Sequence, residues 1–202
     1  MSEFPFLSRV LEMLGPASGV GEDAGAWERL QGELGFELPK DYRKIIDDYA
    51  PVVLNYHFYL GHPATHRWNL RESIETTSKD LSGVDWEDVE GEEGVRAALG
   101  LERLEFGTPR GLVELMGSNR SETVLWAPSL DRPEGRIFCL VGTEAFFEYR
   151  CTFSEWLYRY LVGEDMFGPN SAAFYPGPVH FRRLPMTSGD KKVTWVGPDR
   201  GM

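Results

Sequence analysis

Residues 27–49 read WERLQGELGFELPKDYRKIIDDY, a stretch of two apolar-periodic segments separated by a turn. Its first half carries apolar residues at the spacing of one helix face, namely Trp27, Leu30 and Leu34. Gly35 can adopt the left-handed conformation that ends a helix. Pro39 suits the start of a second helix because no N–H is needed there, and Asp41 complements the positive end of that helix. The second half repeats the pattern with Tyr42, Ile45, Ile46 and Tyr49. The stretch predicts two short amphipathic helices that pack on another layer.

The rest of the chain supplies that layer. Further helices are expected at residues 4–14, 70–81 and 152–161, the last with a capping box formed by Thr152 and Glu155. Strands are expected at residues 52–60, 101–106, 111–116, 123–127, 136–141, 145–149 and, as an edge strand, 193–196. Five aromatic residues are expected in the core: Trp27, Tyr42, Trp126, Phe153 and Trp156. This order predicts an α+β fold in which an antiparallel or mixed sheet packs against N-terminal helices and a closing C-terminal helix.

Composition narrows the class of protein. Among 202 residues, 32 acidic side chains outnumber 21 basic ones, which gives a net charge of −11. Such a surface repels nucleic acid and anionic lipid, so neither is expected as a partner. No apolar run reaches the length of about 18 residues that a membrane span needs, and the N-terminus does not resemble a secretory signal. Two cysteines imply no disulfide framework, so a cytoplasmic location is expected.

The chain is expected to form one domain over residues 1–164, followed by an extension over residues 165–202. The extension is rich in proline and glycine, and from His180 onward it carries five basic residues and two acidic ones. Whether it packs against the domain is left open, as is the oligomeric state.

Several short motifs resemble the SUKH superfamily, which includes the yeast SMI/KNR-type cell-wall regulator and many bacterial immunity proteins. The matching residues are Trp27, Leu34-Gly35, Leu38-Pro39, Asp41-Tyr42, Phe106-Gly107, Gly111, Trp126, Tyr149 and Gly163, within residues 24–164. One departure is Tyr49-Ala50-Pro51, where the family often has a glycine-rich or Asn-Gly turn. The resemblance implies a binding protein that neutralises a toxin domain, often a nuclease. An intracellular adaptor that binds a housekeeping partner is the alternative it also allows.

Residues 85–93 carry six acidic side chains and no lysine or arginine. A solvated loop or a short irregular helix is the simplest interpretation. The functional interpretation is a docking surface for a basic toxin, with Trp86 as an aromatic anchor and the exposed side of the 42–49 helix extending the patch. The candidate binding residues are Asp47, Asp48, Asp85, Trp86, Glu87, Asp88, Glu90, Glu92 and Glu93.

No catalytic, metal or cofactor site is assigned. His57, His62 and His66, with Glu72 beyond them, invite a zinc site, but Pro63 favours polar loop histidines instead. The two cysteines lack any local signature of a nucleophile and are expected to be small buried residues. Without a phosphate-binding loop or a dinucleotide motif, a non-enzymatic protein is expected.

Overall fold

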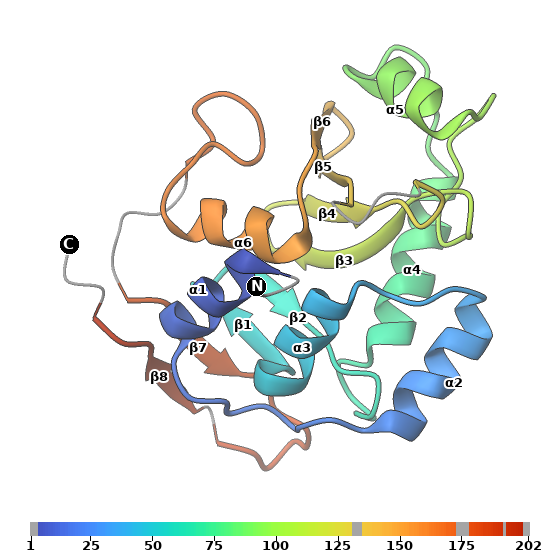
Figure 1. Ribbon diagram of the computed structural model, residues 1–202. Coiled ribbons are helices and arrows are strands. Elements are labelled where there is room, and N and C mark those ends of the chain that lie inside the picture. Colours follow the sequence, from blue (N-terminus) through green and yellow to red (C-terminus); the bar gives the residue numbers. More distant parts are fainter. Residues whose placement is uncertain (1–3, 131–134, 173–177, 192, 200–202) are drawn as a thin grey trace.

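The computed structural model describes residues 4–130, 135–172, 178–191 and 193–199. It is an α+β fold with an antiparallel sheet, as the sequence predicts (Figure 1). The described helices are α1 (Pro5–Leu14), α2 (Ala24–Leu34), α3 (Lys40–Tyr49), α4 (Leu70–Ser82), α5 (Glu92–Leu99) and α6 (Phe153–Leu161). None of them is long and apolar enough to cross a bilayer.

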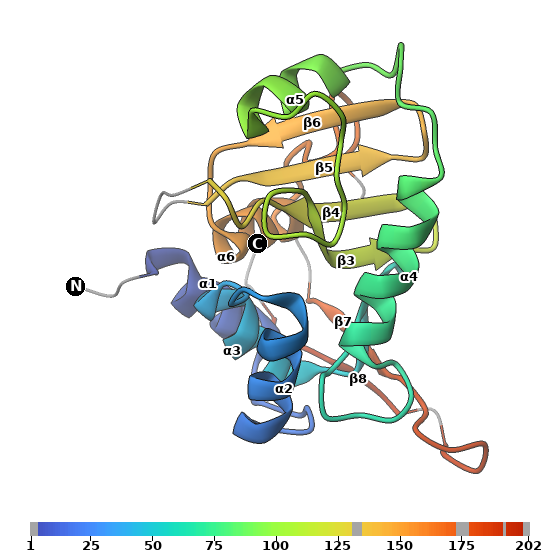
Figure 2. The same cartoon turned by 90° about the vertical axis from the view of Figure 1, so that its right-hand side faces the viewer.

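The strands are β1 (Val52–Leu54), β2 (Phe58–Leu60), β3 (Val113–Ser118), β4 (Glu122–Trp126), β5 (Ile137–Val141), β6 (Ala145–Tyr149), β7 (His180–Arg183) and β8 (Thr194–Val196). They form one sheet in the order β6-β5-β4-β3-β2-β1-β7-β8, and each pair of neighbouring strands is antiparallel. Strands β7 and β8 come from the extension after residue 164, so this segment shares the sheet with the preceding domain. Figure 2 shows the broad strands β3 to β6 with α5 and α4 in front of them.

The two helices of residues 27–49 form as predicted. The Asp23 side chain accepts a hydrogen bond from the Ala26 amide at 2.9 Å, and Gly35 ends α2 with φ +78°. Asp41 does more than complement its own helix. One of its carboxylate oxygens accepts from the Tyr42 amide at 2.9 Å, and the other accepts from the Ser154 amide in the first turn of α6 at 2.7 Å. This buried carboxylate therefore joins the starts of two helices.

The sheet carries a hydrophobic core on each face. The larger core joins the sheet to α1, α3 and α6 and contains Trp27, Tyr42, Phe153 and Trp156, as expected; Trp126 is only partly buried against it. The Tyr42 hydroxyl reaches across this core and donates to the Leu115 carbonyl of β3 at 2.7 Å. A second, smaller core contains nine buried residues: Trp86, Val95, Phe106, Leu112, Leu125, Ala127, Phe138, Leu140 and Phe146.

Two strand predictions differ from the structure, and one strand was not predicted. Residues 52–60 form two short strands around a tight turn, in which the His57 amide donates to the Leu54 carbonyl at 2.8 Å. Residues 101–106 form no strand, because only Phe106 bridges to Leu112. Strand β7 was not predicted, since it gains its register from pairing with the distant β1. The edge strand near residue 195 is confirmed.

Candidate protein-binding site

The acidic segment, residues 85–93, runs beside the edge strand β6. The Glu90 amide donates to the Glu144 carbonyl at 3.3 Å, and the Phe146 amide donates to the Glu90 carbonyl at 2.7 Å. These bonds form a short parallel bridge between Glu90 and Ala145. Exposed edge strands invite unwanted pairing, and this segment occupies the outward-facing Phe146 amide near the start of β6. The acidic segment is therefore part of the fold rather than a loose solvated loop.

Gly91 permits this close approach. Its φ is +82°, and a Cβ atom at this position would lie 2.4 Å from the Phe146 carbonyl oxygen. Both the backbone conformation and the available space exclude a side chain here. Any larger residue would push the acidic segment away from β6.

Trp86 fixes the N-terminal end of the acidic segment. We expected it to be an exposed anchor, and this prediction is wrong. The side chain is 8% exposed, and its ring centroid lies 5.6 Å from that of Phe106 and 5.2 Å from that of Phe146. Its indole N–H donates to the Leu81 carbonyl at 2.9 Å. The ring thus faces the second core, where it holds the acidic segment in place and offers little area to a partner.

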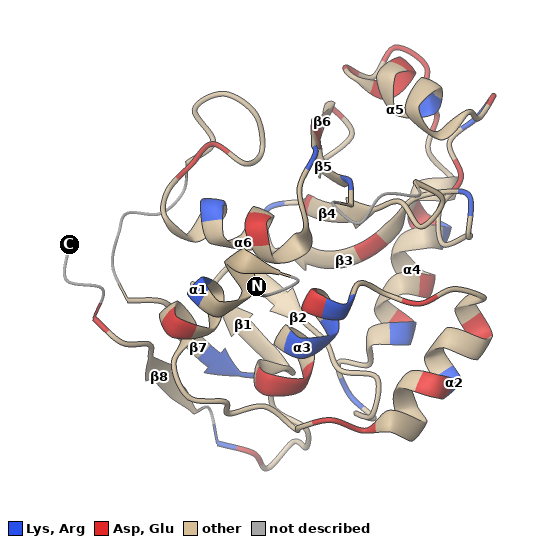
Figure 3. Ribbon diagram, viewed as in Figure 1, with Lys and Arg blue, Asp and Glu red and all other residues tan. Residues whose placement is uncertain are grey.

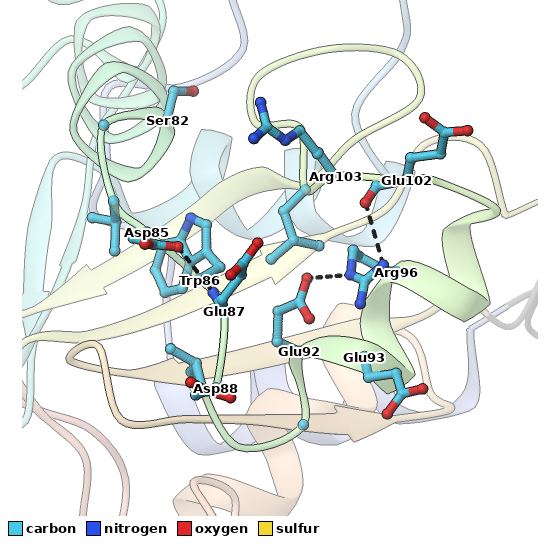
Figure 4. Close-up of a pocket in the computed structure, with 15 residues that line it drawn as sticks. Ser82, Asp85, Trp86, Glu87, Asp88, Glu92, Glu93, Arg96, Glu102 and Arg103 are labelled. Carbon is cyan, nitrogen blue, oxygen red and sulfur yellow. Dashed lines mark hydrogen bonds and ion pairs between the residues drawn. The ribbon is translucent and has the colours of Figure 1, made fainter.

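Glu92 is also engaged within the molecule. Its side chain is 10% exposed and forms an ion pair with Arg96, whose guanidinium also donates to the Glu102 carbonyl at 3.2 Å (Figure 4). The other five acidic residues of the segment are exposed, and within the described parts of the chain none lies within ion-pair distance of a lysine or arginine. These are Asp85, Glu87, Asp88, Glu90 and Glu93.

The acidic segment borders an open hollow of about 970 Å³. Arg103 and Glu102 stand across the hollow from the acidic segment in Figure 4. Six carboxylate residues and two arginines line it: Asp85, Glu87, Asp88, Glu92, Glu93, Glu102, Arg96 and Arg103. A hollow with this excess of negative charge attracts cationic groups, and its open shape admits long side chains from another molecule.

Asp47 and Asp48 do not join this surface. The Asp47 carboxylate accepts from the Trp27 indole N–H at 2.8 Å and lies 3.4 Å from His62 Nε2, while Asp48 pairs with Lys44 at 2.8 Å. Helices α3 and α5 lie well apart in both views (Figures 1 and 2). The predicted set of residues therefore splits into a surface near α5 and a structural pair on α3.

Of the three histidines expected in polar loops, His66 is exposed, whereas His57 and His62 are buried. His57 is 4% exposed and hydrogen-bonded to Asn119 at 2.7 Å, and His62 is fully buried with its Nδ1 accepting from the Ala64 amide at 3.1 Å. Burial lowers the pKa of both imidazoles, which favours their neutral forms. Among the described residues, no three His, Cys, Asp or Glu side chains are grouped to hold a metal ion.

One buried carboxylate was not anticipated from the sequence. Glu114 belongs to β3, and its carboxylate accepts a hydrogen bond from the Ser73 hydroxyl of α4 at 2.9 Å and another from Thr77. Burial raises its pKa to about 7, against the opposing effect of the two hydroxyl donors. A lone glutamate within the apolar run of residues 112–116 was the available signal. Glu114 lines neither the acidic hollow nor the smaller one beside Cys151.

Cys151 borders a hollow of about 170 Å³, which Phe4, Pro39 and Trp126 also line. Burial raises the pKa of its thiol to about 12, so the reactive thiolate is strongly disfavoured. Cys139 is fully buried and receives the Trp156 indole N–H at 3.1 Å. Both cysteines are free and serve as small core residues, as expected.

Comparison of the chain with protein-family models, with curated proteins and with solved structures finds no match in any of the three. The SUKH resemblance therefore stays a prediction from the short motifs within residues 24–164.

Proposed function

We propose that this protein is a non-enzymatic binding protein that uses the acidic segment to bind a basic surface of another protein. The observation that supports this is the set of five exposed carboxylates on a segment that is fixed by β6, Gly91 and Trp86. Four of the five, Asp85, Glu87, Asp88 and Glu93, line the same acidic hollow.

A fixed acidic segment suits binding for two physical reasons. Ordering a loop on binding costs free energy, and this segment is already held by backbone hydrogen bonds and a buried indole. Clustered charges of one sign also steer an oppositely charged partner and raise its association rate, an effect that salt screens. Because Trp86 faces inward, the close contacts would come from arginine and lysine side chains of the partner that enter the hollow.

The resemblance to the SUKH superfamily suggests what this partner is. A nuclease toxin binds phosphate through basic residues, and an acidic protein seated on that surface would block it sterically and electrostatically. We propose neutralisation of such a toxin in the cytoplasm as the biological role. A housekeeping partner with a similar basic surface would use the same residues, as an adaptor interaction.

The test uses a toxin domain encoded beside this gene. The acidic-segment variant carries Asp85→Lys, Glu87→Lys, Asp88→Lys and Glu90→Lys. The matched control carries the same number of reversals at exposed acids of the N-terminal region, namely Glu12, Glu22, Glu28 and Glu37. Both variants change the net charge equally, so only the position of the charges differs.

Co-expression of wild type and of the control should restore growth in the presence of the toxin, whereas the acidic-segment variant should not. Binding by the wild type should also weaken by about tenfold or more when salt is raised, because the contact is electrostatic. If the acidic-segment variant protects as well as the control, the acidic segment is not the binding site. If no adjacent toxin is neutralised by the wild type, but an endogenous protein is bound through the same residues, the adaptor role is supported instead.

A further inference from the structure

Strand β8 is the last strand of the sheet, and among the described residues it pairs only with β7 (Figure 1). Two backbone hydrogen bonds define which side of β8 faces β7. The Arg183 amide donates to the Val193 carbonyl at 2.9 Å, and the Gly197 amide donates to the Val179 carbonyl at 2.8 Å. The pairing with β7 therefore extends from Val193 to Gly197, beyond the three residues of β8 itself.

The backbone of β8 also has a side that faces away from the sheet. Neighbouring residues of an antiparallel strand direct their amides and carbonyls to opposite sides, so those of Thr194 and Val196 point away from β7. We call these outward amides and carbonyls the β8 edge. Thr194 is exposed, and Val196 is 52% exposed. The β8 edge is therefore open to a further strand.

The β8 edge lacks the features that usually prevent strand pairing. Natural edge strands are protected by charged residues, by proline or by a covering segment. Residues 193–197 read VTWVG, with neither a charge nor a proline, and β8 is uncharged in Figure 3 although β7 beside it is basic. At the other end of the sheet, by contrast, the acidic segment bridges to β6. An unprotected edge with exposed Val193 and Val196 indicates a surface that pairs with another strand.

The β8 edge is complementary to itself. Two copies of β8 can pair in the antiparallel direction with Thr194 of one copy opposite Val196 of the other. Both residues have outward backbone groups, so in this register each of them donates one hydrogen bond and accepts one. The arrangement is two-fold symmetric, because the same pair of residues forms on either side of the symmetry axis.

The side chains favour the same register. It places Trp195 directly opposite Trp195 of the second copy, in a non-hydrogen-bonded pair, where side chains lie closest and aromatic pairs stabilise a sheet. The Trp195 ring is already held by stacking on Phe181 at 5.1 Å. Val193 of each copy lies opposite Gly197 of the other, which has no side chain to obstruct it.

The charges that flank β8 select this register among the alternatives. Lys191 precedes the strand and Asp199 follows it, and both are exposed. Continued along the strands, the register brings Lys191 of each copy opposite Asp199 of the other, which gives two pairs of opposite charge. A shift by two residues in either direction is the smallest that keeps the backbone groups paired, and it separates both the tryptophans and these charges.

We propose that two copies of this chain form a closed dimer through their β8 edges, in the register that places Thr194 opposite Val196. The sheets of the two copies then become one continuous antiparallel sheet. An isologous contact uses the same surface on both copies, so the dimer does not add further copies. The contact is small, so the dimer is weak and forms at high protein concentration. It leaves the acidic segment, at the other end of the strand order, accessible to a basic partner.

Sedimentation equilibrium and amide hydrogen exchange test this dimer. NaCl at about 150 mM screens the general repulsion between two chains of net charge −11. The mean mass of the wild type should rise from one copy toward two, and no further, as the protein concentration is raised to about 1 mM. The amides of Thr194 and Val196 should exchange more slowly at high concentration, whereas the Gly197 amide, which donates to Val179 within one copy, should change little. A wild type that stays monomeric throughout, or that grows beyond a dimer, would overturn the proposal.

A lysine at the β8 edge tests its position. Val196→Lys should weaken dimerisation about fivefold or more, because each copy then places a charge within the contact. Thr76→Lys is the matched control. It introduces the same charge at an exposed position of α4, far from β8 in Figure 1, and should leave dimerisation unchanged.

An exchange of charges tests the register. Lys191→Asp places like charges opposite each other and should weaken dimerisation about threefold or more. Asp199→Lys alone should weaken it as well, although this change makes the protein less negative and so reduces the general repulsion. The double variant restores opposite charges across the contact and should dimerise like the wild type.

Equal thermal midpoints in dilute solution, where the protein is monomeric, establish that the variants fold. A Val196→Lys protein that dimerises as well as the wild type would contradict the proposal, as would a double variant that remains as weak as Lys191→Asp. None of these measurements involves a toxin, so failure here leaves the proposed function standing, and the reverse also holds.

Discussion

Glu114→Gln should make the protein more stable at alkaline pH, and the structure gives both the sign and the size of the effect. The folded protein holds the pKa of this carboxyl at about 7, compared with an ordinary value of 4.5. Between these two pH values the folded state binds the proton more tightly than the unfolded state. Stability therefore decreases as pH rises from about 4.5 to about 7 and then levels off, because above pH 7 the buried carboxylate is charged.

The magnitude follows from the same two values. At 1.36 kcal/mol for each pKa unit, the rise from 4.5 to about 7 corresponds to about 3 kcal/mol of lost stability at pH 8. Glutamine has the same shape, stays neutral and can still hydrogen-bond to the hydroxyls of Ser73 and Thr77. Glu114→Gln should therefore exceed the wild type in unfolding free energy by up to about 3 kcal/mol at pH 8 and differ little at pH 5.

Urea unfolding followed by tryptophan fluorescence at pH 5, 6, 7 and 8 measures this difference. Glu93→Gln serves as the control, because it makes the same substitution at an exposed position. Parallel pH profiles for the wild type and Glu114→Gln would refute the reasoning, since they would mean that this carboxyl ionises equally easily in both states.

Three further substitutions test the packing of α6, the hydrogen bonds of Asp41 and the attachment of the acidic segment to β6. Trp156→Ala should cost about 3–5 kcal/mol in urea unfolding because the ring is fully buried, and a loss below about 1 kcal/mol would contradict the packing of α6. Asp41→Asn should cost about 2 kcal/mol in the same assay. Asparagine has one acceptor oxygen where aspartate has two, so either the Tyr42 amide or the Ser154 amide loses its charged acceptor. Gly91→Ala should cost about 1–3 kcal/mol and speed hydrogen exchange at the Phe146 amide; unchanged exchange there would show that the acidic segment stays attached to β6.

The fold could be predicted wherever local pattern and tertiary contact agree. The apolar spacing in residues 27–49 and the Thr152 cap, which accepts from the Glu155 amide at 3.2 Å, both led to helices that the structure contains. The turn between β1 and β2 was missed because Tyr56 occupies a left-handed position without glycine to signal it. Strand β7 was missed because its pairing with β1 links residues that lie far apart in the chain.

The candidate site could be predicted only as a segment, not as a surface. Composition identified residues 85–93, but a single tryptophan among acids gives no sign of which way it faces. Trp86 turns inward because Phe106 and Phe146, both distant in sequence, provide an apolar site for it. Asp47 was assigned to the surface because it is a charged residue. Its hydrogen bond from the Trp27 indole N–H joins residues 20 positions apart, and the sequence does not indicate that contact.

The acidity of residues 85–93 has two separate explanations, and charge reversal distinguishes them. Trp86 and Val89 pack against the second core, and the segment bridges to the start of the edge strand β6 at Ala145. Charged side chains of either sign protect such an edge from pairing with another chain, so protection alone does not require acidic residues. Binding a basic surface does require them. A variant with lysine at positions 85, 87, 88 and 90 should therefore keep its unfolding free energy and its solubility while it loses the partner. Loss of stability together with binding would instead assign these carboxylates to the fold alone.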